Sequence, residues 1–197
     1  MDTPFMNIQG PAGILQAQFD TATDAEGSVA ILCHPHPQYG GSMHDGVLQT
    51  AADVLLANGV DCLRFNFRGV GGSEGSFDNG IGEAQDLLAV ADWVSEAYAD
   101  SPQWWLGYSF GAAMVWRAAQ TAQPGRAILI APPVGMLDFS GAPGGVEIDA
   151  IAGDRDDFVD TAKLQALDGV TAHIIPGADH FFSGYHAQLA DALSAII

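Results

Sequence analysis

Two stretches of the sequence fit the pattern G-x-S-x-G, which in many hydrolases surrounds a nucleophilic serine. The first is GGSEG, centred on Ser73, and the second is GYSFG, centred on Ser109. Glycine is frequent in this chain, with 24 among 197 residues, so the pattern alone does not identify a nucleophile. The elements that flank each serine have to decide between the two.

The flanking residues favour Ser109. A nucleophile elbow is a sharp turn directly between a strand and a helix. The strand-like run QWWLG precedes GYSFG, and the helix-like run AAMVWRAA continues from it. The glycines on either side of the serine allow the strand and the helix to approach closely. Ser73 follows a strand expected to end near Phe67 and precedes the turn-like SFDNG, so we interpret it as a loop residue. The alternative for Ser109 is a helix cap without chemistry.

A nucleophilic serine needs a general base, and the base needs an orienting acid. On α/β sheets of this kind, the chain order is serine, acid, histidine. His180 follows the last expected strand, in PGADHFF, whereas His173 and His186 fall inside an expected strand and helix. His180 is therefore the candidate base. The candidate acids lie in and beside GDRDDFV, and the residues alone do not separate them: Asp154, Asp156, Asp157 and Asp160.

Oxyanion stabilisation requires backbone N–H donors close to the nucleophile. The amide of Phe110 lies at an expected helix N-terminus and is one candidate. The loop HPHPQYGG is expected to supply the second donor, and its prolines are excluded because they lack an N–H. Gln38, Tyr39 and Gly40 are among the loop residues that remain. Metal binding by His34 and His36 is a rival interpretation, but a pair at i and i+2 without a third ligand is weak support. We therefore predict no metal and no cofactor.

Short apolar runs alternate with helical segments along the chain, which predicts one α/β domain over residues 1–197. The mostly parallel sheet is expected to carry helices on both faces. Loops at the carboxyl ends of such strands build active sites. The expected strands are 5–9, 14–20, 28–33, 60–67, 103–107, 126–131, 146–153 and 171–176, and the expected helices are 45–59, 81–100, 109–123, 160–167 and 185–197.

Composition excludes several partner classes. The formal net charge of −18, with Lys163 as the single lysine, repels phosphate backbones and anionic lipid. Neither a nucleic acid nor a membrane partner is expected, and the oligomeric state stays open. No apolar run is long enough to span a membrane or resembles a signal peptide, so a cytoplasmic location is the default expectation. Cys33 and Cys62 are expected to be buried and unpaired.

The motifs together resemble the α/β-hydrolase superfamily, and within it the small cap-less predicted esterases with an HPHP-x-YGG loop. The matching stretches, in chain order, are ILCHPHPQYGGSM, LRFNFRGVGGSEGSFD, LGYSFGAA, GDRDDFV and PGADHFF. The resemblance implies the α/β-hydrolase fold, with about eight strands, an antiparallel hairpin at the start and no cap. It also implies that Asp156 is the acid, because G-x-x-D-x-x-V falls on Gly153, Asp156 and Val159. The donor position of the family falls on the amide of His36.

The predicted function is a serine hydrolase of the carboxylesterase type acting on a small-molecule ester. Without a cap the site is expected to be open and shallow, which favours short acyl groups. A thioesterase or a peptidase with the same triad, and a catalytically silent binding protein, are the alternatives. Arg68 is expected to form a structural ion pair rather than to face substrate. Residues proposed for the walls of the binding pocket are Tyr39, Met43, Phe139, Phe158 and Phe182.

Overall fold

The computed structural model describes residues 5–25, 27–141 and 143–197. Within these residues, eight strands form one sheet in the order β1-β2-β4-β3-β5-β6-β7-β8. The strands β1 and β2 form an antiparallel hairpin, β2 is antiparallel to β4, and the other pairs are parallel. The strands are β1 (Met6–Gly10), β2 (Gly13–Asp20), β3 (Val29–Cys33), β4 (Asp61–Phe65), β5 (Gln103–Tyr108), β6 (Arg126–Ile130), β7 (Glu147–Gly153) and β8 (Val170–Ile175).

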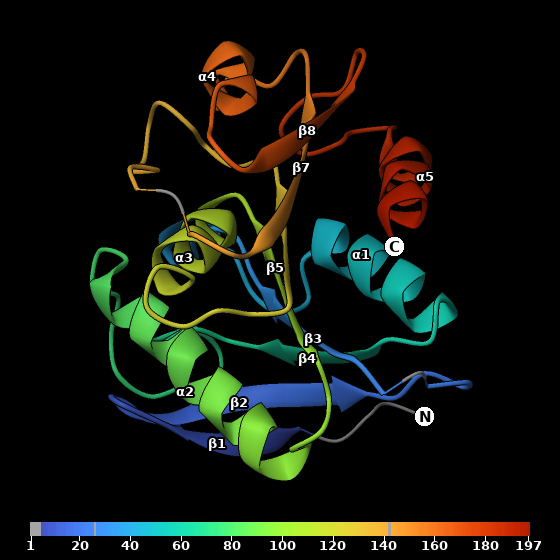
Figure 1. Ribbon diagram of the computed structural model, residues 1–197. Helices are drawn as coiled ribbons and strands as arrows, with labels where there is room; N and C mark the ends of the chain where they lie inside the picture. Colours follow the sequence, from blue (N-terminus) through green and yellow to red (C-terminus); the bar gives the residue numbers. More distant parts are fainter. Residues whose placement is uncertain (1–4, 26, 142) are drawn as a thin grey trace.

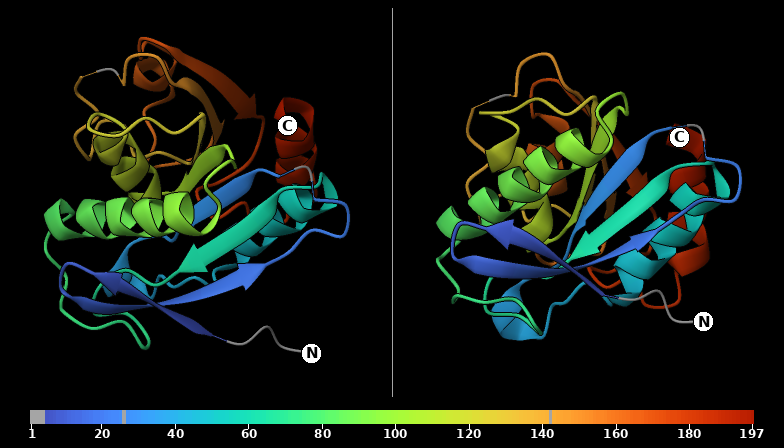
Figure 2. Two further views of the ribbon diagram at one scale, coloured as in Figure 1. Left: turned by 60° about the horizontal axis from the view of Figure 1, so that its bottom comes forward. Right: turned by 90° about the horizontal axis from the view of Figure 1, so that it is seen from below.

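Helices cover both faces of the sheet (Figures 1 and 2). The helices α1 and α5 pack together on one face, and α2 and α3 pack together on the other (Figure 1). The helices are η1 (Pro37–Tyr39), α1 (Gly46–Ala57), α2 (Ile81–Ala97), α3 (Phe110–Ala118), α4 (Thr161–Gln165) and α5 (His186–Ile196). The predicted fold class is confirmed, and the hairpin opens the sheet as expected.

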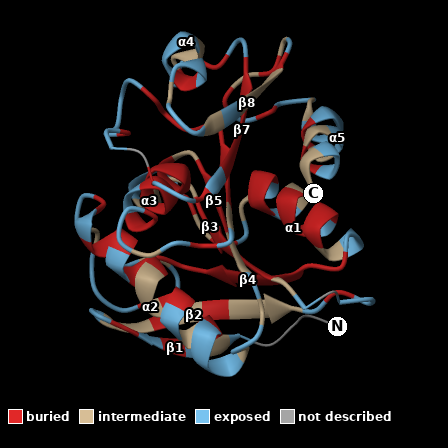
Figure 3. Ribbon diagram, viewed as in Figure 1, coloured by how far each residue is buried: buried red, intermediate tan, exposed pale blue. Residues whose placement is uncertain are grey.

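The central strands lie in the hydrophobic core. Every residue of β3 and β4 is buried, and both strands are red throughout in Figure 3. The continuous apolar run of β3 follows from the helical layers on both faces, which leave no solvent-facing side to a central parallel strand. No helix among the described residues is long and apolar enough to cross a lipid bilayer.

Two details refine the sequence-based prediction. Helix α3 ends at Ala118, five residues before its expected end, because Gln120 and Thr121 already make the tighter i→i−3 bonds of a helix terminus. Cys33 and Cys62 lie on adjacent parallel strands but pair with Phe65 and Ala30, so the thiols stand three residues apart along the sheet. Both cysteines are free and buried.

Candidate active site

The candidate triad side chains meet at the carboxyl ends of the parallel strands. Ser109 follows β5, Asp156 follows β7 and His180 follows β8. The Nε2 atom of His180 lies 2.9 Å from Oγ of Ser109, and its Nδ1 atom lies 2.8 Å from Oδ2 of Asp156. The structure thus brings together, in one hydrogen-bonded chain, the three residues that the sequence analysis selected from distant segments.

The backbone at Ser109 has the geometry of a nucleophile elbow. Its φ of 53° and ψ of −115° are values that residues other than glycine seldom adopt. The amide of Ser109 donates to the carbonyl of Ile130 on β6 over 2.8 Å, which holds the turn against the sheet. A Cβ atom at Gly107 would collide with the backbone of Gly111, and one at Gly111 with the carbonyl of Cys33. Gly107 is therefore required for the close approach of β5 and α3, and Gly111 for that of α3 and β3.

Hydrogen bonding separates the four candidate aspartates. Asp156 is buried, and its Oδ1 atom accepts from the amide of Phe158 over 2.8 Å while Oδ2 faces His180. Asp154 accepts from the amide of Gly177, Asp160 caps α4, and Asp157 is exposed. Among the described residues, Asp156 is the carboxylate that contacts His180, at the position that the resemblance implied.

Aromatic rings surround the imidazole of His180. Their centroids lie 4.6 Å away for Phe158, 5.3 Å for Phe181 and 5.6 Å for Tyr108. The hydroxyl of Tyr108 also donates to the carbonyl of His180 over 3.1 Å. Sequence reasoning missed Tyr108 and Phe181, although each adjoins a candidate triad residue in the chain. This packing leaves His180 buried, with its Nε2 atom facing Oγ of Ser109.

The loop after β3 narrows the choice of oxyanion donors. The amides of Gln38, Tyr39 and Gly40 are engaged within the loop, bonded to Nδ1 of His36, to its carbonyl and to the carbonyl of Pro37. Within the described chain no hydrogen bond occupies the amides of His36 and Phe110, and both residues line the cavity beside Ser109. The ring of His36 packs on that of Phe110 with centroids 4.9 Å apart. These two amides remain the candidate donors.

His34 has a structural role. It is fully buried, its Nδ1–H donates to the carbonyl of Pro35 over 2.6 Å, and its Nε2 accepts from the amide of Phe67 over 3.0 Å. Burial lowers the pKa of His34 to about 4, so the imidazole is neutral. Neither ring nitrogen is free for a metal. Across the described ranges, no group of three or more histidine, cysteine or acidic side chains could hold a metal ion.

A cavity of about 530 Å³ opens beside Ser109. Its walls are mainly apolar and aromatic, formed by Pro35, His36, Tyr39, Gly40, Gly41, Asp45, Tyr108, Phe110, Pro133, Met136, Leu137, Phe158, His180 and Phe181. Pockets of 300–1,000 Å³ bury drug-sized ligands. The volume therefore gives no support to the expectation of a shallow site limited to short acyl groups.

The predicted pocket walls need correction. Tyr39 and Phe158 line the cavity, but Met43 and Phe182 do not: both are fully buried in the core. Phe139 is also buried, with its ring against Trp116. Their places are taken by Met136 and Leu137, from the loop after β6, and by Phe181. No sequence signal distinguished these residues, because an apolar type in a loop does not indicate where its side chain points.

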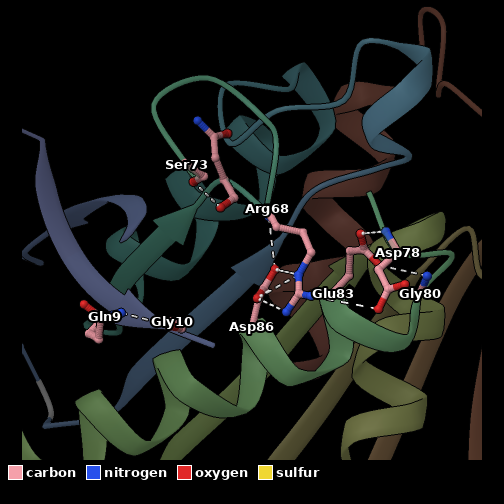
Figure 4. Close-up of polar contacts among 9 residues, drawn as sticks. Gln9, Gly10, Arg68, Ser73, Asp78, Gly80, Glu83 and Asp86 are labelled. Atoms are coloured by element: carbon pink, nitrogen blue, oxygen red, sulfur yellow. Dashed lines mark hydrogen bonds and ion pairs between the residues drawn. The ribbon is translucent and has the colours of Figure 1, made fainter. Parts of the chain in front are cut away.

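Arg68 is bonded to Asp86 of α2, and Ser73 makes separate contacts away from that helix (Figure 4). The guanidinium of Arg68 contacts both carboxylate oxygens of Asp86, with Nη2 at 2.7 Å from Oδ1, and the amide of Arg68 donates to Oδ2. The hydroxyl of Ser73 donates to the carbonyl of Asn66 and accepts from the amide of Gln16. The predicted structural ion pair of Arg68 is confirmed.

Comparison with known proteins places the chain among the α/β serine hydrolases. Residues 29–146 match the model of the family described as serine aminopeptidase, S33, and the chain belongs to that family. An alpha-beta serine hydrolase homologue from Coxiella burnetii is 34% identical, with a TM-score of 0.94 over 100% of this chain and 98% of that one. The protein XC6422 from Xanthomonas campestris, a serine hydrolase without a lid, is 38% identical, with a TM-score of 0.93 over 99% and 93%.

A more distant solved structure shares the fold alone. The esterase Pf2001 from Pyrococcus furiosus is 18% identical, with a TM-score of 0.79 over 98% of this chain and 92% of that one. The resemblance to cap-less α/β-hydrolases, inferred from the motifs, is confirmed by the lidless relatives.

Proposed function

We propose that the protein is a serine hydrolase of the carboxylesterase type, which cleaves small-molecule esters through an acyl-enzyme intermediate. The observation that carries the proposal is the chain of contacts from Ser109 through His180 to Asp156, 2.9 and 2.8 Å long. The proposal is supported by the position of Ser109 and His180 in the wall of an apolar cavity, where an ester carbonyl can reach Oγ of Ser109.

In the first half-reaction, Oγ of Ser109 attacks the ester carbonyl carbon and Nε2 of His180 takes the hydroxyl proton. Asp156 holds the proton on Nδ1 of His180, which keeps the required tautomer, and stabilises the imidazolium that forms. Collapse of the tetrahedral intermediate breaks the carbon–oxygen bond to the alcohol, which leaves with the proton from His180. The serine is then acylated.

In the second half-reaction, His180 takes a proton from water as the oxygen attacks the acyl carbon, and Ser109 leaves with that proton. The products are the carboxylic acid and the free enzyme. The amides of His36 and Phe110 would donate to the oxyanion in both halves, each worth roughly 3–4 kcal/mol of transition-state stabilisation. All atoms come from the ester and water, so the cycle requires no cofactor.

A peptidase is the second candidate, because the matched family model carries the description serine aminopeptidase. The same triad would cleave an amide by protonating an amine instead of an alcohol. The two candidate functions are distinguished by measuring kcat/KM for an ester, a thioester and an anilide that share one acyl group. Preference for the ester supports the proposal, and preference for the anilide favours a peptidase.

The decisive experiment addresses the nucleophile without assuming a substrate. The protein is treated with a fluorophosphonate, which modifies activated serines, and the labelled peptide is mapped by mass spectrometry. We expect label on Ser109 that disappears in His180→Ala. Absence of label, under conditions that modify a control esterase, would overturn the proposal and favour the silent binding protein.

A further inference from the structure

The cavity beside Ser109 is negatively charged in its resting state. Asp45 is the acidic residue in its wall, and neither lysine nor arginine is among the described residues that line it. Burial lowers the pKa of His36, which keeps that side chain neutral near pH 7. His180 must be neutral to act as a base. Among the described side chains that line the cavity, the negative charge is therefore that of the Asp45 carboxylate.

Asp45 is held in place by the helix that follows it. As the N-cap of α1, its Oδ1 atom accepts from the amides of Val47, at 2.8 Å, and Leu48, at 3.3 Å. Within the described part of the chain, no hydrogen bond occupies the second oxygen, Oδ2. The N-terminus of α1 offsets part of the negative charge of Asp45. The charge nevertheless acts on Tyr108, the residue that precedes Ser109. The pKa of Tyr108 is raised by burial and, after that, by the negative charges of Asp45, Asp156 and Asp179, in that order.

The rest of the wall also favours cations. Five aromatic side chains line the cavity: Tyr39, Tyr108, Phe110, Phe158 and Phe181. The faces of aromatic rings attract ammonium groups, and quaternary ammonium ligands are bound in this way. The net charge of −18 adds a long-range field that concentrates cations and repels anions.

We propose that Asp45 is a specificity-determining residue, which makes this cavity select esters that carry a positive charge, an amino or quaternary ammonium group. The expected order of kcat/KM is cationic, then neutral, then anionic ester. This inference rests on the proposed ester hydrolysis and extends it to a substrate class.

Three 4-nitrophenyl esters of equal chain length test the order. Their acyl chains end in trimethylammonium, in the neutral isosteric tert-butyl group, or in carboxylate. We expect each step in the series to change kcat/KM by about three- to tenfold at low ionic strength. The steps should shrink in 1 M salt, where the Debye length is only about 3 Å.

Two variants separate the local charge from the overall charge. Asp45→Asn removes the carboxylate but keeps the cap of α1, because asparagine is an equally good N-cap. It should reduce each of the two ratios of kcat/KM by about two- to threefold, while the share that comes from the aromatic wall and the net charge remains. Asp53→Asn removes the same formal charge from an exposed position on α1 outside the cavity wall, and it should retain the wild-type ratios.

The proposal is overturned if the neutral ester is the best substrate, if Asp45→Asn keeps the wild-type ratios, or if Asp53→Asn changes them equally. Each of these results leaves ester hydrolysis intact, with Ser109 labelled by fluorophosphonate. Binding of the same esters to Ser109→Ala, measured by calorimetry, tests the charge order independently of turnover. Failure of the proposed function, seen as absent turnover and absent label, is therefore distinguishable from failure of this inference.

Discussion

The ring of Phe158 lies 4.6 Å from the imidazole of His180, centroid to centroid, and the amide of the same residue donates to Oδ1 of Asp156 over 2.8 Å. One residue thus contacts the proposed base through its side chain and the proposed acid through its backbone. The ring is 40% exposed and lines the cavity. Phe158 therefore contributes more to the position of His180 than to the stability of the core.

Phe158→Ala should lower kcat by about 10- to 100-fold, because a small displacement of the base is costly in rate. The melting temperature should change little, since the ring is partly exposed. Steady-state kinetics with a 4-nitrophenyl ester and thermal unfolding measure the two effects. Leu137→Ala is the matched comparison: Leu137 is also 40% exposed and lines the cavity, but it lies in the loop after β6. It should mainly raise KM, and equal losses of kcat in the two variants would refute the positioning role.

The two serines of the G-x-S-x-G stretches should behave oppositely. Ser109→Ala should lower ester turnover by at least about 10⁴-fold, as loss of a nucleophile does in other serine hydrolases. Ser73→Ala should keep turnover but reduce the free energy of unfolding by about 1–2 kcal/mol, because its buried hydroxyl bonds Asn66 and Gln16. Kinetics and urea unfolding of both variants decide the point. Comparable loss of turnover in both would reverse the assignment of the nucleophile.

Arg68→Met should reduce the free energy of unfolding by about 3–5 kcal/mol, because it leaves the carboxylate of Asp86 buried without its partner. Asp86 is fully buried, and the pair is bidentate. Arg68→Met/Asp86→Asn removes the uncompensated charge and keeps an acceptor for the amide of residue 68. Denaturant unfolding should show the double variant to be more stable than the single one. A double variant less stable than Arg68→Met would contradict this explanation.

His34 makes the stability of the fold depend on pH. Burial lowers its pKa from the ordinary value of 6.5 to about 4 in the folded state. Between these values the unfolded state binds the additional proton, so the contribution of neutral His34 is complete above pH 6.5 and is lost as the pH falls toward 4. The loss is on the order of 3 kcal/mol.

His34→Gln isolates this contribution, because glutamine does not titrate and its carbonyl can accept from the amide of Phe67. The difference in unfolding free energy between the wild type and the variant should decrease steadily from pH 7 to pH 4. Urea unfolding at half-unit pH intervals measures this difference. A difference that stays constant with pH would show that His34 does not contribute through its protonation.

The sequence by itself determined the architecture and the chain order of the site. Alternating strands and helices imply a mostly parallel sheet, and parallel strands bring their carboxyl ends to one edge. That topology is sufficient to predict that Ser109 and His180 lie near each other, although they are 71 residues apart. The elbow at Ser109 is also local, since a serine flanked by glycines between a strand and a helix specifies the turn with adjacent residues.

Only the tertiary structure decided which side chains the cavity contains. Met43 and Phe182 have the apolar character of wall residues, but the packing of distant elements places them in the core, while Met136, Leu137 and Phe181 line the cavity. The contribution of Asp45 likewise depends on where α1 begins relative to β5, which no local pattern encodes. The physical reason is that residue type sets the free energy of burying a side chain, whereas contacts between distant segments decide which side chains become buried.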